Sequence, residues 1–274
     1  MMGRTNLMLV CVALLAFAST LPGQATTRSS SQPATAPEET PERKAQIDKM
    51  IERQVAQDPY FFGDREFARL KSPYAVQQLL VKMNDKDRKV RMQASRALGF
   101  MRDHAATDAL LKMLAVEDKQ EKFAATYALG HLGDKRATAL LLKMFGDGSL
   151  SANTRGGIAD ALGLIGDKES VPALKEAAKN KDDYLRVCSI RALMAMGDED
   201  GIAAAIDILK SDLPWGLKIM IVAESRKHPD ARFKEHLVSL LKDKTPIANE
   251  AAAAIKTIDA MPATSSAPAS QPAK

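Results

Sequence analysis

A short motif, Ala-Leu-Gly, returns along this chain at nearly constant intervals. It stands at residues 97–99, 128–130 and 161–163, and in the weaker form Ala-Leu-Met at 192–194. Counted on the leucines, the steps are 31, 33 and 31 residues. Such a period is typical of solenoids, in which each unit is too short to bury its own apolar face and must stack on its neighbours. The spacing therefore predicts a stacked array of similar units.

Residues on either side of each motif predict where the helices begin and end. Eleven residues before each leucine stands a side chain that can accept hydrogen bonds from the free amides of a helix N-terminus. These residues are Asp87, Asp118, Ser151 and Asp182. Five residues after each leucine stands an aspartate, in three cases preceded by a glycine of the kind that often ends a helix. These are Asp103, Asp134, Asp167 and Asp198, with Gly133, Gly166 and Gly197. Because the aspartates recur, we expect caps or a ladder between repeats rather than catalytic carboxylates.

Apolar residues between cap and glycine fall on one face of a helix. In the first clear repeat they are spaced at i, i+4, i+7, i+8 and i+11, at Val90, Ala94, Ala97, Leu98 and Met101. A second helical segment follows each turn, at 109–114, 139–145, 171–178, 202–209 and 233–241. No stretch alternates apolar and polar residues as a half-buried strand would. The chain is therefore predicted to be all-α.

The residues of these helix pairs resemble a known family. Val90-Arg91, Ala97-Leu98-Gly99 and Val171-Pro172-Ala173-Leu174 resemble the short HEAT-like repeats of the phycobilisome-lyase type. The resemblance covers residues 72–212 and extends more weakly to 258. It implies a right-handed α-solenoid (superhelix) of about six helix pairs that is used mostly as a protein-binding scaffold. In that family a basic residue seven positions before the leucine ties adjacent repeats together, and here this position holds Arg91, Lys122, Arg155 and Arg186.

Both ends of the chain differ in composition from the repeats. Arg4, the apolar run Leu7–Ala18 and the small residues of Gly23-Gln24-Ala25 are typical of a cleavable signal peptide over 1–25. An uncleaved anchor is the alternative, although a membrane span needs about 20 apolar residues. Residues rich in Ser, Thr, Pro and Ala predict a disordered linker over 26–41 and a disordered tail over 259–274. The solenoid should occupy 42–258 and begin with a capping helix at Glu42–Gln57, and the mature protein should be periplasmic or secreted.

Cleavage of the signal would leave Cys188 as the lone cysteine. An internal disulfide is then impossible, so the solenoid must be held by packing. Cys188 stands inside an apolar helix, and we expect a small buried side chain there rather than a reactive thiol.

Two groups of residues are candidates for binding a partner. Three consecutive aromatics, Tyr60, Phe61 and Phe62, stand out in a chain that is only 5% aromatic; they are either a core plug or an exposed anchor. The second group recurs on the second helices at steps of 30, 31 and 32 residues, at Lys82, Lys112, Lys143 and Lys175. These lysines either lie on a helix face that is simply exposed to solvent, or form a basic stripe that attracts an acidic peptide, an anionic polymer or lipid headgroups. The resemblance places second helices on the concave side of most such solenoids.

Motifs that carry chemistry were not found. The four histidines are scattered, the glycines near 146–157 lack the Lys-Ser or Lys-Thr of a phosphate loop, and no metal ligand set or cofactor motif is present. Gly156-Gly157 within a predicted helix suggests close approach of a neighbouring helix.

We therefore expect an exported, non-enzymatic and monomeric scaffold that binds another protein along its solenoid surface. A lyase-like enzyme or enzyme subunit is the alternative by analogy of fold alone. Binding of nucleic acid or another anionic polymer is a further alternative, since the net charge is +5, or +4 without residues 1–25. The export signal and the lack of clustered arginines with interleaved aromatics argue against nucleic acid. A membrane would be contacted only through an uncleaved N-terminal segment.

Overall fold

The structure of this chain, a computed structural model, describes residues 39–56 and 65–261. Within these ranges all regular secondary structure is helical, which confirms the predicted all-α chain. The described residues fall into two compact units, one within 39–170 and the other within 171–261. The predicted signal peptide, most of the linker and tail, and the aromatic triplet Tyr60, Phe61 and Phe62 lie outside the described residues.

The unit within 39–170 contains eight described helices and three short 3₁₀ turns. The helices are α2 (Pro41–Ala56), α3 (Arg65–Arg69), α4 (Pro73–Lys82), α5 (Arg88–Met101), α6 (Thr107–Ala115), α7 (Lys119–Leu132), α8 (Thr138–Phe145) and α9 (Ala152–Ile165). The 3₁₀ turns are His104–Ala106, Lys135–Ala137 and Lys168–Ser170. The helix expected at Glu42–Gln57 is thus α2, shifted by one residue.

The unit within 171–261 continues the same alternation of helices. It contains α10 (Val171–Ala177), α11 (Asp183–Ala195), α12 (Glu199–Lys210), α13 (Trp215–Lys227), the 3₁₀ turn Ala231–Phe233, α14 (Lys234–Leu240) and α15 (Ile247–Asp259). In this unit α11, α13 and α15 pack on one another, while α10, α12 and α14 lie against them. In chain order the helices from α5 to α14 make five pairs, close to the expected number.

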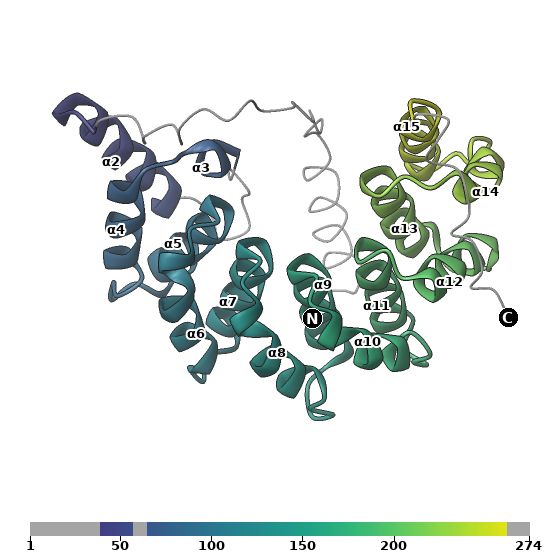
Figure 1. Ribbon diagram of the computed structural model, residues 1–274, viewed down its shortest axis with the longest axis horizontal. Helices are drawn as coiled ribbons and strands as arrows, with labels where there is room; N and C mark the ends of the chain where they lie inside the picture. The colour runs from purple at the N-terminus through teal and green to yellow at the C-terminus, as the bar shows by residue number, and fades with distance from the viewer. Residues whose placement is uncertain (1–38, 57–64, 262–274) are drawn as a thin grey trace, which may run out of the picture. The chain divides into compact units, whose positions relative to one another are not determined.

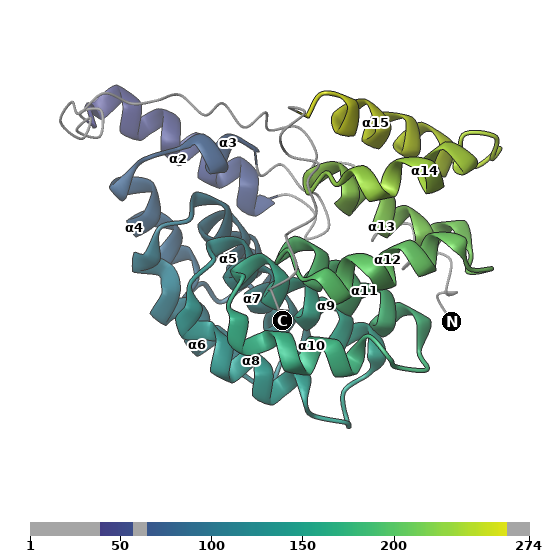
Figure 2. The ribbon, with the colours of Figure 1, turned by 45° about the vertical axis from the view of Figure 1, so that its right-hand side comes forward.

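Two layers of helices form the unit within 39–170. Helices α5, α7 and α9, which carry the Ala-Leu-Gly motifs, pack successively on one another, and α4, α6 and α8 pack against them. Within this unit, Figures 1 and 2 show α5, α7 and α9 on the inner side of its bend and α4, α6 and α8 on the outer side. The expectation that the lysine-bearing second helices line a concave side is therefore wrong for this unit.

The glycine of the motif explains why these helices lie so close together. A methyl group added at Gly99 would lie 2.6 Å from the carbonyl oxygen of Ala128, and one added at Gly130 would lie 2.8 Å from the Cα of Ala161. Close approach was expected at Gly156-Gly157 instead. At Gly157, however, an added methyl would have ordinary contact, at 3.5 Å from the Phe123 ring. The motif glycines let the helix backbones of α5, α7 and α9 meet, whereas Gly157 makes no such close contact.

The predicted helix caps are confirmed. Asp87 accepts a hydrogen bond from the amide of Lys89, and Asp118 accepts from the amides of Gln120 and Glu121. Ser151 and Asp182 cap α9 and α11 in the same way.

The predicted glycine turns are confirmed as well. Gly133 and Gly166 end α7 and α9 in the left-handed conformation, with φ of 76° and 69°. Arg102 holds the corresponding place after α5 with φ of 53°, so the turn keeps this conformation even where the sequence supplies no glycine.

The recurring aspartates cap the helical segments that follow them and also connect neighbouring repeats. Asp103, Asp134 and Asp198 cap the segments that follow them. Within 39–170 they also form a ladder, because the Thr107 hydroxyl donates to Asp134 at 2.6 Å and the Thr138 hydroxyl donates to Asp167 at 3.1 Å. Each threonine begins the second helix of one repeat and reaches the turn of the next repeat.

Asp134 is the most heavily bonded member of this ladder. Its side chain is 9% exposed and accepts hydrogen bonds from Arg136, Thr107 and His104. The bond from the Arg136 guanidinium, followed by those from Thr107 and His104, holds the pKa of this carboxyl well below its usual range against the opposing effect of burial.

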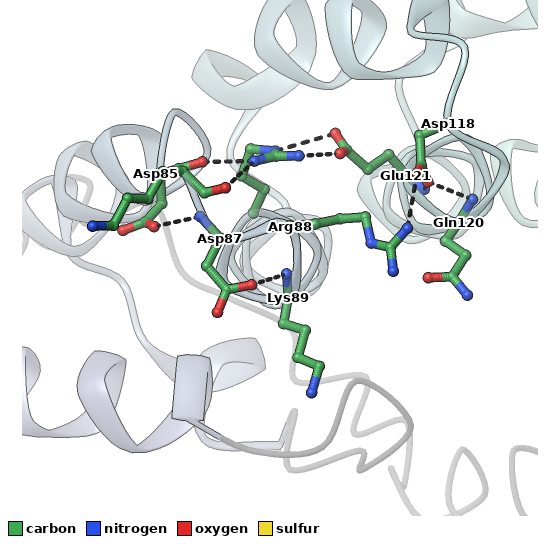
Figure 3. Close-up of polar contacts among 9 residues, drawn as sticks. Asp85, Asp87, Arg88, Lys89, Asp118, Gln120 and Glu121 are labelled. Atoms are coloured by element: carbon green, nitrogen blue, oxygen red, sulfur yellow. Dashed lines mark hydrogen bonds and ion pairs between the residues drawn. The ribbon is translucent and has the colours of Figure 1, made fainter.

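Arginines tie the beginnings of successive helices together, as the resemblance implied. The Arg88 guanidinium lies 2.9 Å from the Asp118 carboxylate of the next repeat, as Figure 3 shows. Arg91 forms an ion pair with Glu121 and donates to the carbonyl of Asp85 at 2.7 Å. Together these bonds connect the turn before α5 to the first turn of α7.

We predict that an added methyl group has opposite effects at two glycines of this layer. Gly130→Ala should lower the free energy of unfolding by about 2 kcal/mol, because α7 and α9 must separate to admit it. Gly157→Ala should raise it by about 0.5–1 kcal/mol, because the site has room and alanine favours a helix. Urea denaturation of both variants measures the difference, and equal effects at the two sites would contradict it.

A second prediction compares two aspartates that cap in the same way. Asp134→Ala should cost about 3 kcal/mol, because it removes a cap and leaves charged and polar donors around a buried site without their acceptor. Among the described residues, the Asp103 side chain accepts only the capping hydrogen bond from the Ala105 amide. Asp103→Ala should therefore cost about 1 kcal/mol. Thermal melting of the pair checks the difference, and similar losses would show that the ladder adds nothing to the cap.

Candidate binding surface

The predicted lysines occupy equivalent places in successive second helices. Lys82, Lys112, Lys143 and Lys175 each lie in the last turn of α4, α6, α8 and α10. A cation there interacts favourably with the free carbonyl groups of the helix C-terminus. Lys175, in the unit within 171–261, lies 3.0 Å from Asp198 and 2.7 Å from Asp200, so its charge is already paired. A binding role for the lysines stays a prediction.

A different surface lies on the inner layer, at positions that do not repeat. At the positions two residues before and two residues after each motif leucine, five of the six side chains are at least partly exposed, whereas the Ala-Leu-Gly residues are buried. In α5, α7 and α9 the position before the leucine holds Arg96, Tyr127 and Asp160, and the position after it holds Phe100, His131 and Leu164. The buried motif positions are nearly identical between repeats, whereas these positions are all different.

Three of these residues form a ring cluster that connects α5 and α7. The centroids of Phe100 and His131 lie 4.3 Å apart, those of Tyr127 and His131 lie 4.5 Å apart, and those of Phe100 and Tyr127 lie 5.9 Å apart. The guanidinium of Arg96 lies 5.4 Å from the centre of the Tyr127 ring. Aromatic pairs and cation–π contacts of this kind fix side chains in place.

Two large apolar side chains extend this cluster into solvent. Phe123 on α7 is 45% exposed and Leu164 on α9 is 44% exposed. Along α7, residues 119, 123, 127 and 131 follow at steps of four and therefore lie on one face of the helix. Lys119, Phe123, Tyr127 and His131 thus form one ridge. We call this ridge, with Phe100 and Leu164, the inner face.

Sequence reasoning missed the inner face because its residues are separated along the chain. It selected Tyr60, Phe61 and Phe62 because they are consecutive. A comparison of the repeats with one another could have identified the inner face. Positions two residues before and after the leucine are the ones at which the repeats differ most.

Basic residues outnumber acidic residues on the helices that carry the inner face. Helices α5, α7 and α9 hold seven Lys or Arg and two Asp or Glu. One of the two acids, Glu121, is buried and paired with Arg91. The three helices of the inner layer therefore carry a net positive charge.

The unit within 171–261 holds a cavity of about 270 Å³ and a buried carboxylate beside it. Met194, Gly197, Ile202, His228, Pro229, Asp230 and Phe233 line the cavity. Glu224 is 5% exposed, and its carboxylate lies 3.4 Å from His228 and 3.2 Å from Lys227. Burial raises the pKa of Glu224, but the hydrogen bond to His228 and the charges of Lys227 and Arg191 outweigh it and bring the pKa to about 2.

The remaining candidate chemistry is limited in the described part of the chain. Cys188 is buried, as expected. No group of three or more His, Cys, Asp or Glu side chains there could hold a metal ion. Among the described helices, none has the length and apolarity to cross a membrane.

The low pKa of Glu224 gives a pH-dependent prediction. Because its folded pKa lies below the ordinary value of 4.5, ionised Glu224 stabilises the fold above about pH 4.5 and this contribution is lost as the pH falls toward about 2. Glu224→Gln should therefore destabilise the protein at about pH 6, and this disadvantage should be clearly smaller at about pH 3. Urea denaturation at both pH values measures the change, with Glu235→Gln on exposed α14 as the control. A difference from wild type that does not change with pH would contradict the assigned electrostatics.

Comparison with known proteins gives one family. A model described as HEAT repeats matches residues 65–129 and 147–225, and a model described as PBS lyase HEAT-like repeat matches residues 122–147. The comparison with curated proteins gave no match.

The fold was also compared with solved structures, which are similar at low sequence identity. A chain from the complex of CpcE and CpcF of phycocyanin lyase from Nostoc sp. PCC7120 is 17% identical, with a TM-score of 0.51, over 88% of this chain and 98% of that chain. An archaeal HEAT-like repeats protein from Thermococcus onnurineus NA1 is 16% identical, with a TM-score of 0.40, over 84% and 98% of the two chains. The first of these, together with the family models, supports an α-solenoid. Because the HEAT-repeat match alone extends over more than half of the 274 residues, the chain belongs to the HEAT-repeat family.

Proposed function

We propose that this chain is a non-enzymatic scaffold that holds another protein against the inner face. The observation that carries this proposal is the exposure of Phe123 and Leu164 beside a fixed ring cluster. Large apolar side chains gathered in this way, with an arginine and a tyrosine beside them, are typical of protein interfaces. Folding of the repeats does not explain their exposure, because packing is supplied by the buried Ala-Leu-Gly positions.

We propose further that the scaffold works outside the cytoplasm. This rests on the sequence of residues 1–25, where an apolar run of 12 residues follows Arg4 and precedes Gly23-Gln24-Ala25. Mass spectrometry of the protein recovered from the cell envelope or the medium should find a new N-terminus near Thr26. Exported protein that still begins at Met1 or Met2 would contradict cleavage, and protein found only in the cytoplasm would contradict export.

Lyase activity is the alternative class of function. The likeness to a chain of phycocyanin lyase, at 17% identity, supports the fold alone, so the alternative depends on analogy.

Site-specific crosslinking tests the proposed face directly. Benzoylphenylalanine placed at Phe123 keeps an aromatic ring at an exposed site, and the same amino acid placed at Val81 provides the control. Val81 is 66% exposed on α4, in the outer layer of the same unit. Irradiation in cells should give one reproducible protein adduct from position 123 and none from position 81.

The adducts also decide between the two candidate surfaces. An adduct from position 81 alone would move the site to the outer layer, which carries Lys82, Lys112 and Lys143, and would contradict the inner face. Absence of any protein adduct from position 123 would contradict the scaffold function.

A further inference from the structure

We infer that the partner segment held by the inner face is an acidic peptide that carries an apolar anchor side chain. This inference rests on the proposed function and specifies the chemistry of the partner. Two independent features of the inner layer support it: room for an apolar side chain beside Phe123, and lysines on α5 and α7 that form no ion pair with the described residues.

The room beside Phe123 comes from the glycine pair of α9. Phe123 stands out from α7 toward α9, where residues 156 and 157 have no side chains. An added methyl at Gly157 would meet, outside its own helix backbone, only the Phe123 ring within 4 Å. Leu164 lies two turns further along α9 and is exposed as well. A leucine or phenylalanine of the partner can therefore cover the Phe123 ring without displacing any side chain of α9.

Lysines on α5 and α7 carry positive charges that can interact with an anionic partner. Lys119 lies one turn before Phe123 on the same ridge, and Lys89 and Lys122 lie on the same layer. Within the described residues, these three ammonium groups form no ion pair. Of the nearby acids, Asp118 is paired with Arg88 and Glu121 with Arg91, so Asp160 on α9 is the other carboxylate that a partner would meet on these three helices. Carboxylates of a partner would therefore meet cations that form no ion pair with the described part of the chain.

The same surface suits a peptide better than a nucleic acid. Stacking of bases needs exposed aromatic faces, but Phe100 and His131 stack on each other, at 4.3 Å and an interplanar angle of 31°. Arg96 is 5% exposed and lies over Tyr127, so it cannot extend to a phosphate backbone. Leu164 is aliphatic and offers no stacking surface. Phe123 is the one of these side chains that offers an exposed ring, whereas binding of single-stranded nucleic acid commonly stacks several successive bases on aromatic side chains. The inner face therefore favours a partner that buries an apolar side chain.

Fluorescence anisotropy with synthetic probes tests the inference on the full chain. The first probe is a fluorescein-labelled peptide of Glu and Asp residues with a central Leu-Phe pair. The second probe has Ser-Ser in place of Leu-Phe, and the third keeps Leu-Phe but has Lys in place of the acids. A labelled single-stranded oligonucleotide is the fourth probe. The first probe should bind at least about tenfold more tightly than the second, because one buried apolar anchor contributes at least that factor. It should also bind more tightly than the third, because the lysines of the third probe are repelled by the basic side chains of the inner layer.

Variants on the protein locate the binding. Phe123→Ala should weaken binding of the first probe about tenfold. Gly157→Leu should weaken it similarly by filling the room beside the ring, and it leaves the charges unchanged. Lys119→Glu should weaken it about fivefold at low salt and less at high salt. The matched control, Lys112→Glu on the outer layer, should change binding by less than about twofold. Circular dichroism melting curves confirm that each variant is folded.

The remaining outcomes overturn the inference in distinguishable ways. Equal binding of the first two probes would show that no anchor is used, and tighter binding of the oligonucleotide would identify a nucleic acid instead. If folded Phe123→Ala and Gly157→Leu bind the first probe as tightly as the wild type does, the probe does not bind at the inner face. If crosslinking at position 123 captures a protein but the acidic probe binds no better than the basic one, the face is correct and the partner chemistry is wrong. Failure of both experiments would reject the scaffold function itself.

Discussion

Contact between helix backbones governs the arrangement of the unit within 39–170. At Gly99 against Ala128 and at Gly130 against Ala161, successive helices approach so closely that a methyl group would not fit. In the other layer, Leu110, Met113, Leu141 and Phe145 fill the core with larger side chains. Because small residues let helices approach and large residues hold them apart, the α5–α7–α9 layer lies on the inner side of the bend. Residue volume at a few positions thus decides which layer is concave.

The same contact determines which side chains remain for binding. The motif residues are buried in the contacts between helices, so their side chains can vary little in size. These are Ala97, Leu98 and Gly99 and their counterparts in the other repeats. Residues two positions away, such as Tyr127 and His131, point out of that contact, so their identity is not fixed by the repeat. This freedom lets one repeat carry a ring and the next a carboxylate or an aliphatic chain. A periodic fold can in this way present a surface that is not periodic.

Local features could be predicted from the sequence because they depend on neighbours in the chain. Caps such as Asp118 and the turn glycine Gly133 satisfy helix ends within a few residues, and the ladder aspartates were recognised from their recurrence. The concave layer was predicted wrongly, because it depends on distances between helices that the sequence pattern does not give. The ion pair of Lys175 with Asp200 was also missed, because a contact between residues 25 positions apart needs the packing of helices to bring it about.

Arg102 shows how a departure from the repeat can connect the fold to the inner face. Its left-handed conformation costs roughly 1–2 kcal/mol in a residue with a side chain, whereas Gly133 and Gly166 adopt the same turn without that cost. The arginine offsets part of this strain, because its Nε donates at 3.0 Å to the carbonyl oxygen of His131. That bond satisfies a carbonyl at the end of α7 and joins the turn of one repeat to the ring cluster of the next. A glycine at this turn would relieve the strain but would remove the bond that joins this turn to His131 at the edge of the inner face.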